Sequence, residues 1–498
     1  KLTAHLASYL QRLPNMNQGD RVAIMMPNVL QNPIAKFAAL RAGFTVVNTN
    51  PLYTPRELKH QLVDSGAKVI IVMENFCGTL AEVIDQTPIE HVITTQLGDM
   101  LKFPKSFIVN LVVKHIKKMV PPFTLKRSVK FKTALAEGAR VEHIKASISP
   151  DDIAFLQYTG GTTGVAKGAM LTNLNMVANM QQASAWIKDG VDEGKDIIIT
   201  ALPLYHIFSL TANCLTFMKV GAENYLITNP RDMAGFVKEL KAVPFTAITG
   251  VNTLFVGLLN TPGFNEIDFS HLKLTLGGGM AVQKPVAERW KAATGSPLLE
   301  AYGLTETAPA VCINPVNLLE HNGSIGLPVP STEVSIQDED GRILPQGESG
   351  ELCVRGPQVM KGYWNNEDET AKVMTDDGWF KTGDVAMMDK AGFFTILDRL
   401  KDMIVVSGFN VYPNEVEAII VGLEGVLEVG VVGEPNPNGG EIIKAVIVKK
   451  DQSLTEEIVI EHCRVNLTRY KVPKIIEFKT ELPKTNVGKI LRRELKST

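Results

Sequence analysis

One short segment of the sequence combines four glycines, three threonines and a lysine. It reads Tyr158-Thr-Gly-Gly-Thr-Thr-Gly-Val-Ala-Lys-Gly168 and directly follows the apolar run Ile153–Leu156. Glycines let a backbone approach a ligand closely, threonine hydroxyls donate hydrogen bonds, and Lys167 supplies a mobile positive charge, which together suit a polyphosphate. The segment lacks the Gly-Lys-Ser/Thr ending of a P-loop, which argues against a P-loop kinase or motor ATPase. A Gly/Thr-rich surface turn is the alternative interpretation.

Three further segments carry residue types suited to nucleotide and metal binding, and each also has an ordinary structural interpretation. Gly277-Gly-Gly279 follows a strand, where open α/β sheets bind ligands, but a tight turn would look the same. Tyr302-Gly-Leu-Thr-Glu306 offers an aromatic face for a purine and a carboxylate for Mg²⁺, or else a core tyrosine beside a solvated glutamate. Asp384, after a glycine, could accept both ribose hydroxyls while Arg399 donates nearby; otherwise both form turns and ion pairs.

Two single residues complete the set of candidates. His206 ends the segment Pro203-Leu-Tyr-His206, a position where a histidine is more often structural than catalytic. Lys489 ends the segment Pro483-Lys-Thr-Asn-Val-Gly-Lys489, close to the C-terminal end of the chain, where most lysines are simply solvated. Neither residue indicates a particular chemistry by itself.

The segments that must position these residues alternate between strands and helices. Apolar runs such as Val22–Met26 and Val69–Val72 are separated by helical stretches such as Pro33–Gly43 and Pro55–Gly66. Continuous apolar strands with amphipathic helices between them indicate parallel sheets covered on both faces. From about residue 326 the sequence changes to short strands and Gly/Pro turns, and the last hundred residues return to mixed α and β patterns.

The sequence therefore predicts an α/β protein with two unequal parts. The large N-terminal body, residues 1–400, consists of stacked, mostly parallel αβα sheets and includes a β-rich subdomain over about 326–400. The small α+β C-terminal domain covers residues 401–498. Because the chain begins at Lys1 inside a helical pattern, we expect its natural N-terminus to lie upstream.

Composition excludes several classes of protein. Of 498 residues, 45% are apolar and 21% are charged, which is typical of a globular chain and not of a disordered one. The 51 basic and 53 acidic residues give a net charge of -2, so we expect no nucleic-acid partner. The five cysteines lack C-x-x-C spacing, which disfavours a disulfide framework or structural zinc and fits a reducing compartment. No apolar run approaches the roughly 18 residues needed to cross a bilayer.

One segment departs from this balance of charge. Residues 101–132 contain nine basic residues and no acidic residue. On a helical wheel Asn110, Lys114, Lys117 and Lys118 share one narrow arc, and apolar residues cover most of the rest. A basic amphipathic helix of this kind can lie in an anionic membrane interface, so we expect an anionic membrane surface as a partner of this segment. The alternative is an ordinary surface helix with solvated lysines.

Taken together, in this order and spacing, these segments resemble the adenylate-forming superfamily of acyl-CoA synthetases, peptide-synthetase adenylation domains and luciferases. The resemblance covers the chain from about residue 20 to its end. Within the superfamily it is closest to bacterial long-chain fatty-acyl-CoA synthetases, as in Ala201–His206, Gly250–Thr253 and Ser407–Glu415. It implies ATP-dependent activation of long-chain fatty acids to acyl-CoA through an acyl-adenylate, with release of AMP and pyrophosphate. The alternatives are a ligase for a medium-chain or aryl acid, a carrier-protein-loading ligase, and a non-catalytic lipid-binding module.

The resemblance also implies a role for each candidate residue. Lys489, Glu306 and His206 would be catalytic, and Glu306 with Thr159 would hold Mg²⁺. Lys401 would be the hinge about which a mobile C-terminal domain rotates. The residues expected to bind ATP and CoA are Tyr158, Thr159, Gly160, Gly161, Thr162, Thr163, Gly164, Lys167, Gly278, Gly279, Tyr302, Gly303, Thr305, Asp384, Arg399, Lys401 and Gly408.

The implied setting is the cytoplasm, with peripheral association at the inner face of the cell membrane. The implied partners are a long-chain fatty acid, ATP and CoA. A homodimer is compatible with the sequence.

Overall fold

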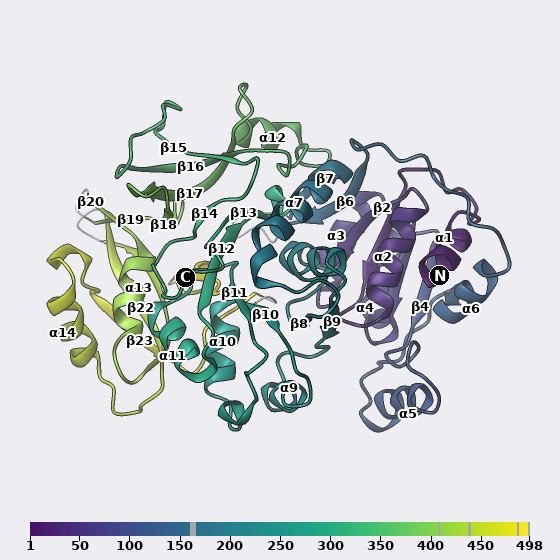
Figure 1. The fold of residues 1–498 in the computed structure, drawn as a ribbon, viewed down its shortest axis with the longest axis horizontal. Coiled ribbons are helices and arrows are strands. Elements are labelled where there is room, and N and C mark those ends of the chain that lie inside the picture. The colour runs from purple at the N-terminus through teal and green to yellow at the C-terminus, as the bar shows by residue number, and fades with distance from the viewer. Residues whose placement is uncertain (160–165, 407–408, 437–439, 486–487, 497–498) are drawn as a thin grey trace.

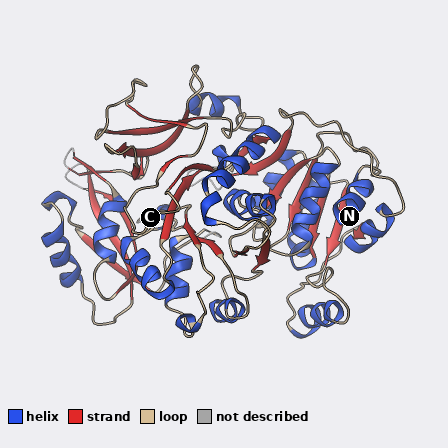
Figure 2. Cartoon of the chain, viewed as in Figure 1, coloured by secondary structure: helices blue, strands red, loops and turns tan. Residues whose placement is uncertain are grey.

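The computed structural model of the protein describes residues 1–159, 166–406, 409–436, 440–485 and 488–496 (Figure 1). Its described strands form two seven-stranded sheets and three smaller sheets, with helices packed against them (Figure 2). The α/β class predicted from the alternating segments is confirmed, with a large body and a smaller C-terminal part.

The first large sheet is parallel except at one edge, where β7 runs antiparallel to β6. In spatial order its strands are β5 (Ser128–Lys130), β4 (His91–Thr95), β3 (Val69–Met73), β1 (Arg21–Met25), β2 (Thr45–Thr49), β6 (Ile153–Tyr158) and β7 (Gly168–Thr172). Alternate residues of β3 enter two different cores, Val69 and Ile71 on one face and Ile70 and Val72 on the other. The continuous apolar runs of the sequence thus correspond to strands that are buried on both faces.

The second large sheet carries the candidates Gly278, Gly279, Tyr302 and Gly303 at its strand ends. In spatial order its strands are β14 (Leu327–Pro328), β13 (Ala310–Ile313), β12 (Leu298–Gly303), β11 (Leu274–Gly277), β10 (Ala247–Gly250), β8 (Ile197–Thr200) and β9 (Glu223–Leu226). The five strands from β12 to β9 are parallel, and β13 and β14 extend the sheet in antiparallel pairing.

Three smaller sheets follow in the second half of the chain. One has four strands, β15 (Glu333–Gln337), β16 (Ser349–Arg355), β17 (Phe380–Met388) and β18 (Phe394–Arg399). Beyond it come the β19 (Ile404–Val406) and β20 (Phe409–Val411) hairpin and a sheet of β21 (Val426–Pro435), β22 (Glu441–Lys449) and β23 (Ile475–Lys479). The β-rich stretch expected from about residue 326 therefore corresponds to the four-stranded sheet, which lies above the large sheets in Figure 1.

The helices lie where the sequence alternates with the strands. They are α1 (Leu2–Leu10), α2 (Gln31–Arg41), α3 (Pro55–Ser65), α4 (Cys77–Val83), α5 (Lys105–Leu111), α6 (Phe131–Gly138), α7 (Asn173–Trp186), α8 (Thr216–Lys219), α9 (Met233–Leu240), α10 (Asn252–Leu259), α11 (Lys284–Thr294), α12 (Glu367–Val373), α13 (Pro413–Val421) and α14 (Glu456–Asn466). Local chemistry sets their ends, as in α3, where Thr54 and Glu57 form a capping box and Gly66 ends the helix at a φ of 61°.

The segment between residues 101 and 120, called the arm below, differs from the single amphipathic helix that its pattern predicts. Helix α5 is short and continues as a π-helix over Val112–Ile116, so Lys117 and Lys118 lie beyond the helical residues. Asn110 accepts a hydrogen bond from the backbone of Gly98 (2.7 Å), and Lys114 lies 3.8 Å from the carboxylate of Glu74. Part of the predicted polar arc therefore faces the body of the protein.

The described helices include none that is long and apolar enough to span a bilayer.

Polar side chains from α2 and the loop before it tie the first large sheet to the loop after β8. Asn28 donates to the carbonyls of Thr200 and Leu202 (both 2.9 Å) and accepts from the backbone N–H of Leu204 (2.8 Å). The ammonium of Lys36 donates to the carbonyl of Leu204 (2.5 Å). Lys36 is 2% exposed, and this burial lowers its pKa to about 7.

The buried amine makes the stability of the protein depend on pH. A lysine in an unfolded chain has a pKa of about 10.4. Between pH 7 and about 10, Lys36 therefore binds a proton more often in the unfolded chain than in the folded protein. The contribution of Lys36 to stability therefore rises with pH in this window. We expect Lys36→Met to lose that rise, so its free energy of unfolding should fall relative to the parent as pH increases. Denaturant titrations between pH 7 and 9.5 measure this, and a constant difference would contradict it.

Candidate active site

The Gly/Thr-rich segment is the connection between β6 and β7. Tyr158 pairs with Gly168 across the hairpin, and the backbone N–H of Thr159 donates to the carbonyl of Lys167 (2.9 Å), which closes the base of the loop. The hydroxyl of Tyr158 donates to Asp64 on α3 (2.5 Å), so this ring is held in the core under the loop. The expected phosphate ligands Gly160, Gly161, Thr162, Thr163 and Gly164 lie outside the described residues.

A chain of polar contacts leads from this loop to the candidate metal ligand. The ammonium of Lys167 lies 4.6 Å from the ring centre of Tyr363 and 2.6 Å from Glu369 on α12. The hydroxyl of Tyr363 donates to Oε1 of Glu306 (2.8 Å). The hydrogen bonds of Lys167 and Lys372 lower the pKa of Glu369 to about 2. The structure thus brings Lys167 and Glu306 to the same end of the site, as the sequence interpretation requires.

The surroundings of Glu306 fit a magnesium ion that also contacts a substrate. Its side chain is 9% exposed in a short 3₁₀ turn (Thr305–Thr307), and no hydrogen bond to Oε2 comes from the described residues. The described part of the chain contains no cluster of three or more metal-ligating side chains. Mg²⁺ is commonly held by one or two carboxylates together with substrate phosphates and water. Glu306 would therefore hold the ion only in the presence of a phosphate ligand, with Thr159 on the facing loop.

Two glycines after β11 and one at the end of β12 lie where the backbone of the chain packs closely or has a positive φ. A Cβ on Gly278 would lie 2.9 Å from the carbonyl of Ala301, and Gly279 has a φ of 77°, which favours glycine. A Cβ on Gly303 would lie 2.0 Å from the carbonyl of Pro309. Only glycine fits at these positions, and they lie at the carboxyl ends of neighbouring parallel strands, where α/β sheets bind ligands.

The aromatic and ionic candidates meet between the second sheet and the four-stranded sheet. The hydroxyl of Tyr302 donates to Oδ2 of Asp384 (2.6 Å), and Nε of Arg399 lies 3.1 Å from Oδ1 of the same carboxylate. Asp384 and Arg399 are directly opposite each other on β17 and β18. Burial and the charge of Asp384 hold the pKa of Tyr302 well above its usual range, so its hydroxyl stays protonated as a donor. A buried carboxylate with these partners can accept hydrogen bonds from vicinal hydroxyls.

Lys489 reaches this site from the other end of the chain. Its backbone N–H donates to the hydroxyl of Thr485, and its carbonyl accepts from the backbone of Thr485, which forms a tight loop. The hydroxyl of Thr253 on α10 donates to the carbonyl of Gly488 (3.0 Å), so the loop is attached to the large body. Lys401, at the end of β18, is exposed, and Gly408 lies outside the described residues.

The charge of Lys489 and the charges of other candidate residues act on one another. Burial and the neighbouring charge of Arg399 lower the pKa of Lys489 to about 8. Burial, together with the charge of Lys489, lowers the pKa of His206 to about 4. The Nδ1 atom of His206 accepts from the backbone N–H of Phe208 (3.3 Å), so the neutral ring carries its proton on Nε2. His206 is therefore a neutral hydrogen-bond donor near neutral pH.

Sequence reasoning missed three residues that hold this site together. Tyr363 orients Glu306, Glu369 pairs with Lys167, and Thr253 anchors the Lys489 loop. Each partner lies 57 or more positions away in the sequence, so no local spacing indicates the pair. The motif Gly250–Thr253 contains Thr253, but nothing in it indicates the partner.

A search of protein families places the whole arrangement in a known class. The chain belongs to the AMP-binding enzyme family, whose model matches residues 1–364, and the model of the AMP-binding enzyme C-terminal domain matches residues 415–489. The resemblance inferred from the sequence is confirmed.

Several individual proteins of known name are similar to this chain over nearly its whole length. The chain is 57% identical over 490 residues to a long-chain-fatty-acid–CoA ligase of Escherichia coli O6:H1, with 98% of this chain and 87% of that protein covered. It is 54% identical over 493 residues to the enzyme of the same name from Haemophilus influenzae, with the same coverage of 98% and 87%. Among solved structures it is similar to an anthranilate CoA ligase in complex with anthranoyl-AMP. The TM-score is 0.87 at 25% identity, with 99% of this chain and 90% of that chain covered.

The interaction of Lys489 with His206 can be tested without any substrate. Because the charge of Lys489 contributes to the low pKa of His206, we expect Lys489→Ala to raise the pKa of His206 above about 4. A proton NMR titration of the imidazole measures this shift. Lys484 lies in the same loop as Lys489, but its charge is paired with Glu428. The control variant Lys484→Ala should therefore leave the His206 pKa unchanged. Equal titration of His206 in the parent and Lys489→Ala would contradict the placement.

Proposed function

We propose that this protein activates long-chain fatty acids to acyl-CoA with ATP, through an acyl-adenylate and with release of AMP and pyrophosphate. The observation that carries the proposal is the position of Lys489, a cation in the last loop of the chain, which the hydrogen bond from Thr253 to the carbonyl of Gly488 attaches to α10. Its charge acts on His206, and Arg399 and Asp384 act on it. Relatives that are 54% and 57% identical over nearly the whole chain bear the name of this activity.

In the first half-reaction, a carboxylate oxygen of the fatty acid attacks the α-phosphorus of ATP, and the bond to pyrophosphate breaks. Two anions must approach each other, so positive charge is needed where they meet. Lys489 would supply that charge from a buried position in the last loop of the chain. Lys167 and the Thr159 loop would bind the phosphates, Tyr302 and the three glycines would accommodate adenine, and Asp384 with Arg399 would bind the ribose.

Magnesium held at Glu306 would neutralise charge on the phosphates. Lys167 pairs with Glu369 at 2.6 Å, so the phosphates of ATP would take the place of a carboxylate as its partner. The exchange of one anion for another keeps Lys167 charged and paired throughout, which limits the cost of ordering it.

In the second half-reaction, the thiol of CoA attacks the acyl carbon, and the bond to AMP breaks to leave the thioester. Lys489 is needed only while two anions approach, so it can leave the site before this step. We propose that residues 401–498 form a domain, that the domain rotates about Lys401 between the two steps, and that Gly408 then borders the channel for CoA. Such an alternation also limits the exposure of the acyl-adenylate to water.

A pyrophosphate-release assay across a series of carboxylic acids, with and without CoA, tests the reaction. We expect the highest kcat/KM with long-chain acids. We expect Lys489→Ala to lower pyrophosphate release by about a hundredfold or more, because the charge that stabilises the transition state is lost. The same variant should still form acyl-CoA from supplied acyl-adenylate.

Two outcomes of that assay would change the proposal. A preference for medium-chain or aryl acids would change the substrate and leave the mechanism intact. Equal loss of both half-reactions in Lys489→Ala would remove Lys489 from the first step.

We further propose that the arm docks the enzyme on an anionic membrane surface at the inner face of the cell membrane, where its substrate partitions. Large apolar side chains on the arm face solvent, with Phe103 85%, Ile116 66% and Phe107 62% exposed. Apolar patches of this kind mark interaction sites. In Figure 1, α5 projects away from the sheets at the edge of the molecule, where a flat surface can reach it.

The contacts of the arm fix which residues are available to a membrane. Asn110 and Lys114 are bonded to the body, which leaves the apolar side chains outside. Lys117 and Lys118 are exposed at its end. Each basic residue near an anionic leaflet contributes on the order of 1 kcal/mol, and burial of the apolar side chains adds to this.

We expect the purified protein to sediment with phosphatidylglycerol vesicles at low salt and to be released as salt rises. The double variant Lys117→Glu/Lys118→Glu and the double variant Phe103→Ser/Phe107→Ser should each weaken this binding while activity on detergent-dispersed substrate is unchanged. Lys188→Glu/Lys195→Glu makes the same change of charge at exposed positions outside the arm and should bind like the parent. Binding that is indifferent to lipid charge would contradict the proposal.

A further inference from the structure

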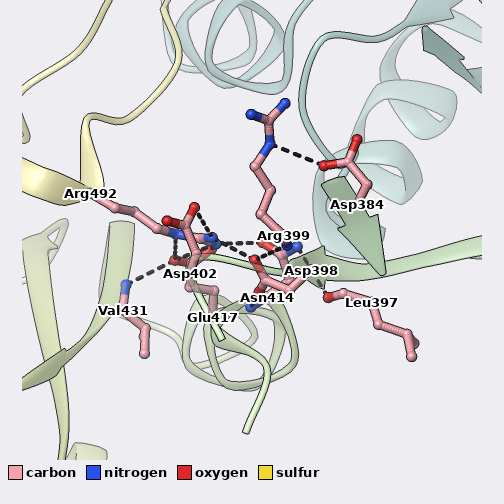
Figure 3. Close-up of polar contacts among 9 residues, drawn as sticks. All are labelled: Asp384, Leu397, Asp398, Arg399, Asp402, Asn414, Glu417, Val431 and Arg492. Atoms are coloured by element: carbon pink, nitrogen blue, oxygen red, sulfur yellow. Dashed lines mark hydrogen bonds and ion pairs between the residues drawn. The ribbon is translucent and has the colours of Figure 1, made fainter. Parts of the chain in front are cut away.

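Arg492 lies at the centre of a buried polar cluster where the C-terminal part of the chain meets the large body (Figure 3). Its guanidinium pairs with Asp398 at 2.8 Å and with Glu417 at 3.0 Å. It also donates to the side chain of Asn414 at 2.5 Å and lies 3.5 Å from Asp402. Although burial opposes the charged form, the charges of Glu417 and Asp398 raise the pKa of Arg492 above its usual value. Arg492 is therefore a permanent cation.

The partners of Arg492 come from both sides of Lys401, the expected hinge. Asp398 lies on β18, before the hinge, whereas Asn414 and Glu417 lie on α13, after it. The side chain of Asp398 is fully buried and also accepts from the backbone N–H of Asn414 (2.8 Å). If residues 401–498 rotated as a body, Arg492 would keep Glu417 and Asn414 and would lose Asp398.

The ion pair of Asp398 with Arg492 is one of two attachments that flank Lys489. One residue before Lys489, the carbonyl of Gly488 accepts from Thr253 of the large body. Three residues after it, Arg492 is held by Asp398 of the large body. The short segment that carries Lys489 is thus fixed to the large body at both ends. A long, flexible side chain needs such fixation, because a misplacement of about 1 Å can cost a hundredfold in rate.

We propose that Asp398 and Arg492 are positioning residues for Lys489, and that their ion pair across the hinge favours the conformation in which Lys489 occupies the active site. Neither residue contacts the reacting atoms. The ion pair acts in the first half-reaction and has to break before the second. This inference rests on the proposed function for its kinetic consequence, but its structural claim stands on the contacts alone.

Asp398→Asn tests the ion pair because it keeps the shape of the side chain and removes its charge. We expect pyrophosphate release to fall at least about tenfold, while acyl-CoA formation from supplied acyl-adenylate stays within about twofold of the parent. We also expect the pKa of His206 to rise in the ligand-free protein, as it should in Lys489→Ala, because the charge of Lys489 leaves its surroundings. A merely structural defect would lower both half-reactions together.

The His206 titration separates this inference from the proposed function, since it requires no substrate. An unchanged His206 pKa in Asp398→Asn overturns the inference, whatever the activity. A parent that releases no pyrophosphate with any long-chain acid overturns the proposed function, and the titration still decides the inference.

Two further variants complete the experiment. Arg492→Lys keeps the buried charge but cannot serve all its partners at once, so we expect changes in the same direction even if Asp398→Asn does not fold. Glu415→Gln breaks an ion pair with Lys471 that lies wholly after the hinge, and it should leave both half-reactions and the His206 pKa as in the parent. If Glu415→Gln reproduces the effects of Asp398→Asn, the inference is wrong.

Discussion

The rest of the site depends on keeping one lysine charged in a place where charge is unfavourable. Burial and the charge of Arg399 lower the pKa of Lys489 to about 8, so the ammonium is still the main form at neutral pH. Asp384 and Asp402 favour the charged lysine, whereas Arg399 and Arg492 oppose it. A cation poised in this way is stabilised strongly by an incoming anion. Burial and the charge of Lys489 also disfavour a second positive charge, which keeps His206 neutral.

Charged groups of the site form ion pairs whose members a nucleotide could bind in exchange for their present partners. Lys167 pairs with Glu369, and Arg399 pairs with Asp384. A charged group that is buried without a partner loses its hydration and gains no compensating interaction, which raises the free energy of the folded protein. Phosphate and ribose oxygens can take the place of the carboxylates or share their donors. Nucleotide binding would therefore mainly replace one set of polar contacts with another.

Sequence patterns predicted the strands and helices of the large sheets well, because their apolar runs are buried on both faces and the glycines sit where only glycine fits. The strands and helices expected over residues 22–72 correspond to β1, α2, β2, α3 and β3, and their bounds differ from the expected ones by about two residues at most. What could not be predicted are contacts between distant segments, such as Tyr363 with Glu306 or Asp398 with Arg492. For the arm, a helix formed as predicted only over Lys105–Leu111, and the expected periodicity fails where the π-helix begins at Val112. The helical wheel also could not show that Asn110 would bond to the body.

One irregularity in β18 connects the nucleotide-binding face to the C-terminal part of the chain. Asp384 pairs with Arg399 and Val385 with Asp398, but Ala386 pairs with Ile396, so Leu397 is an extra residue in the strand. Because side chains alternate along a strand, Arg399 points to Asp384 while Asp398 points the opposite way, to Arg492 (Figure 3). The carbonyl of Leu397 accepts from the side chain of Asn414, which satisfies a group that the bulge leaves without a ladder partner. If Leu397 paired with Val385 as in a regular strand, Asp398 would lie opposite Asp384 and Arg399 opposite Gly383, so Arg399 would lose the carboxylate that orients it.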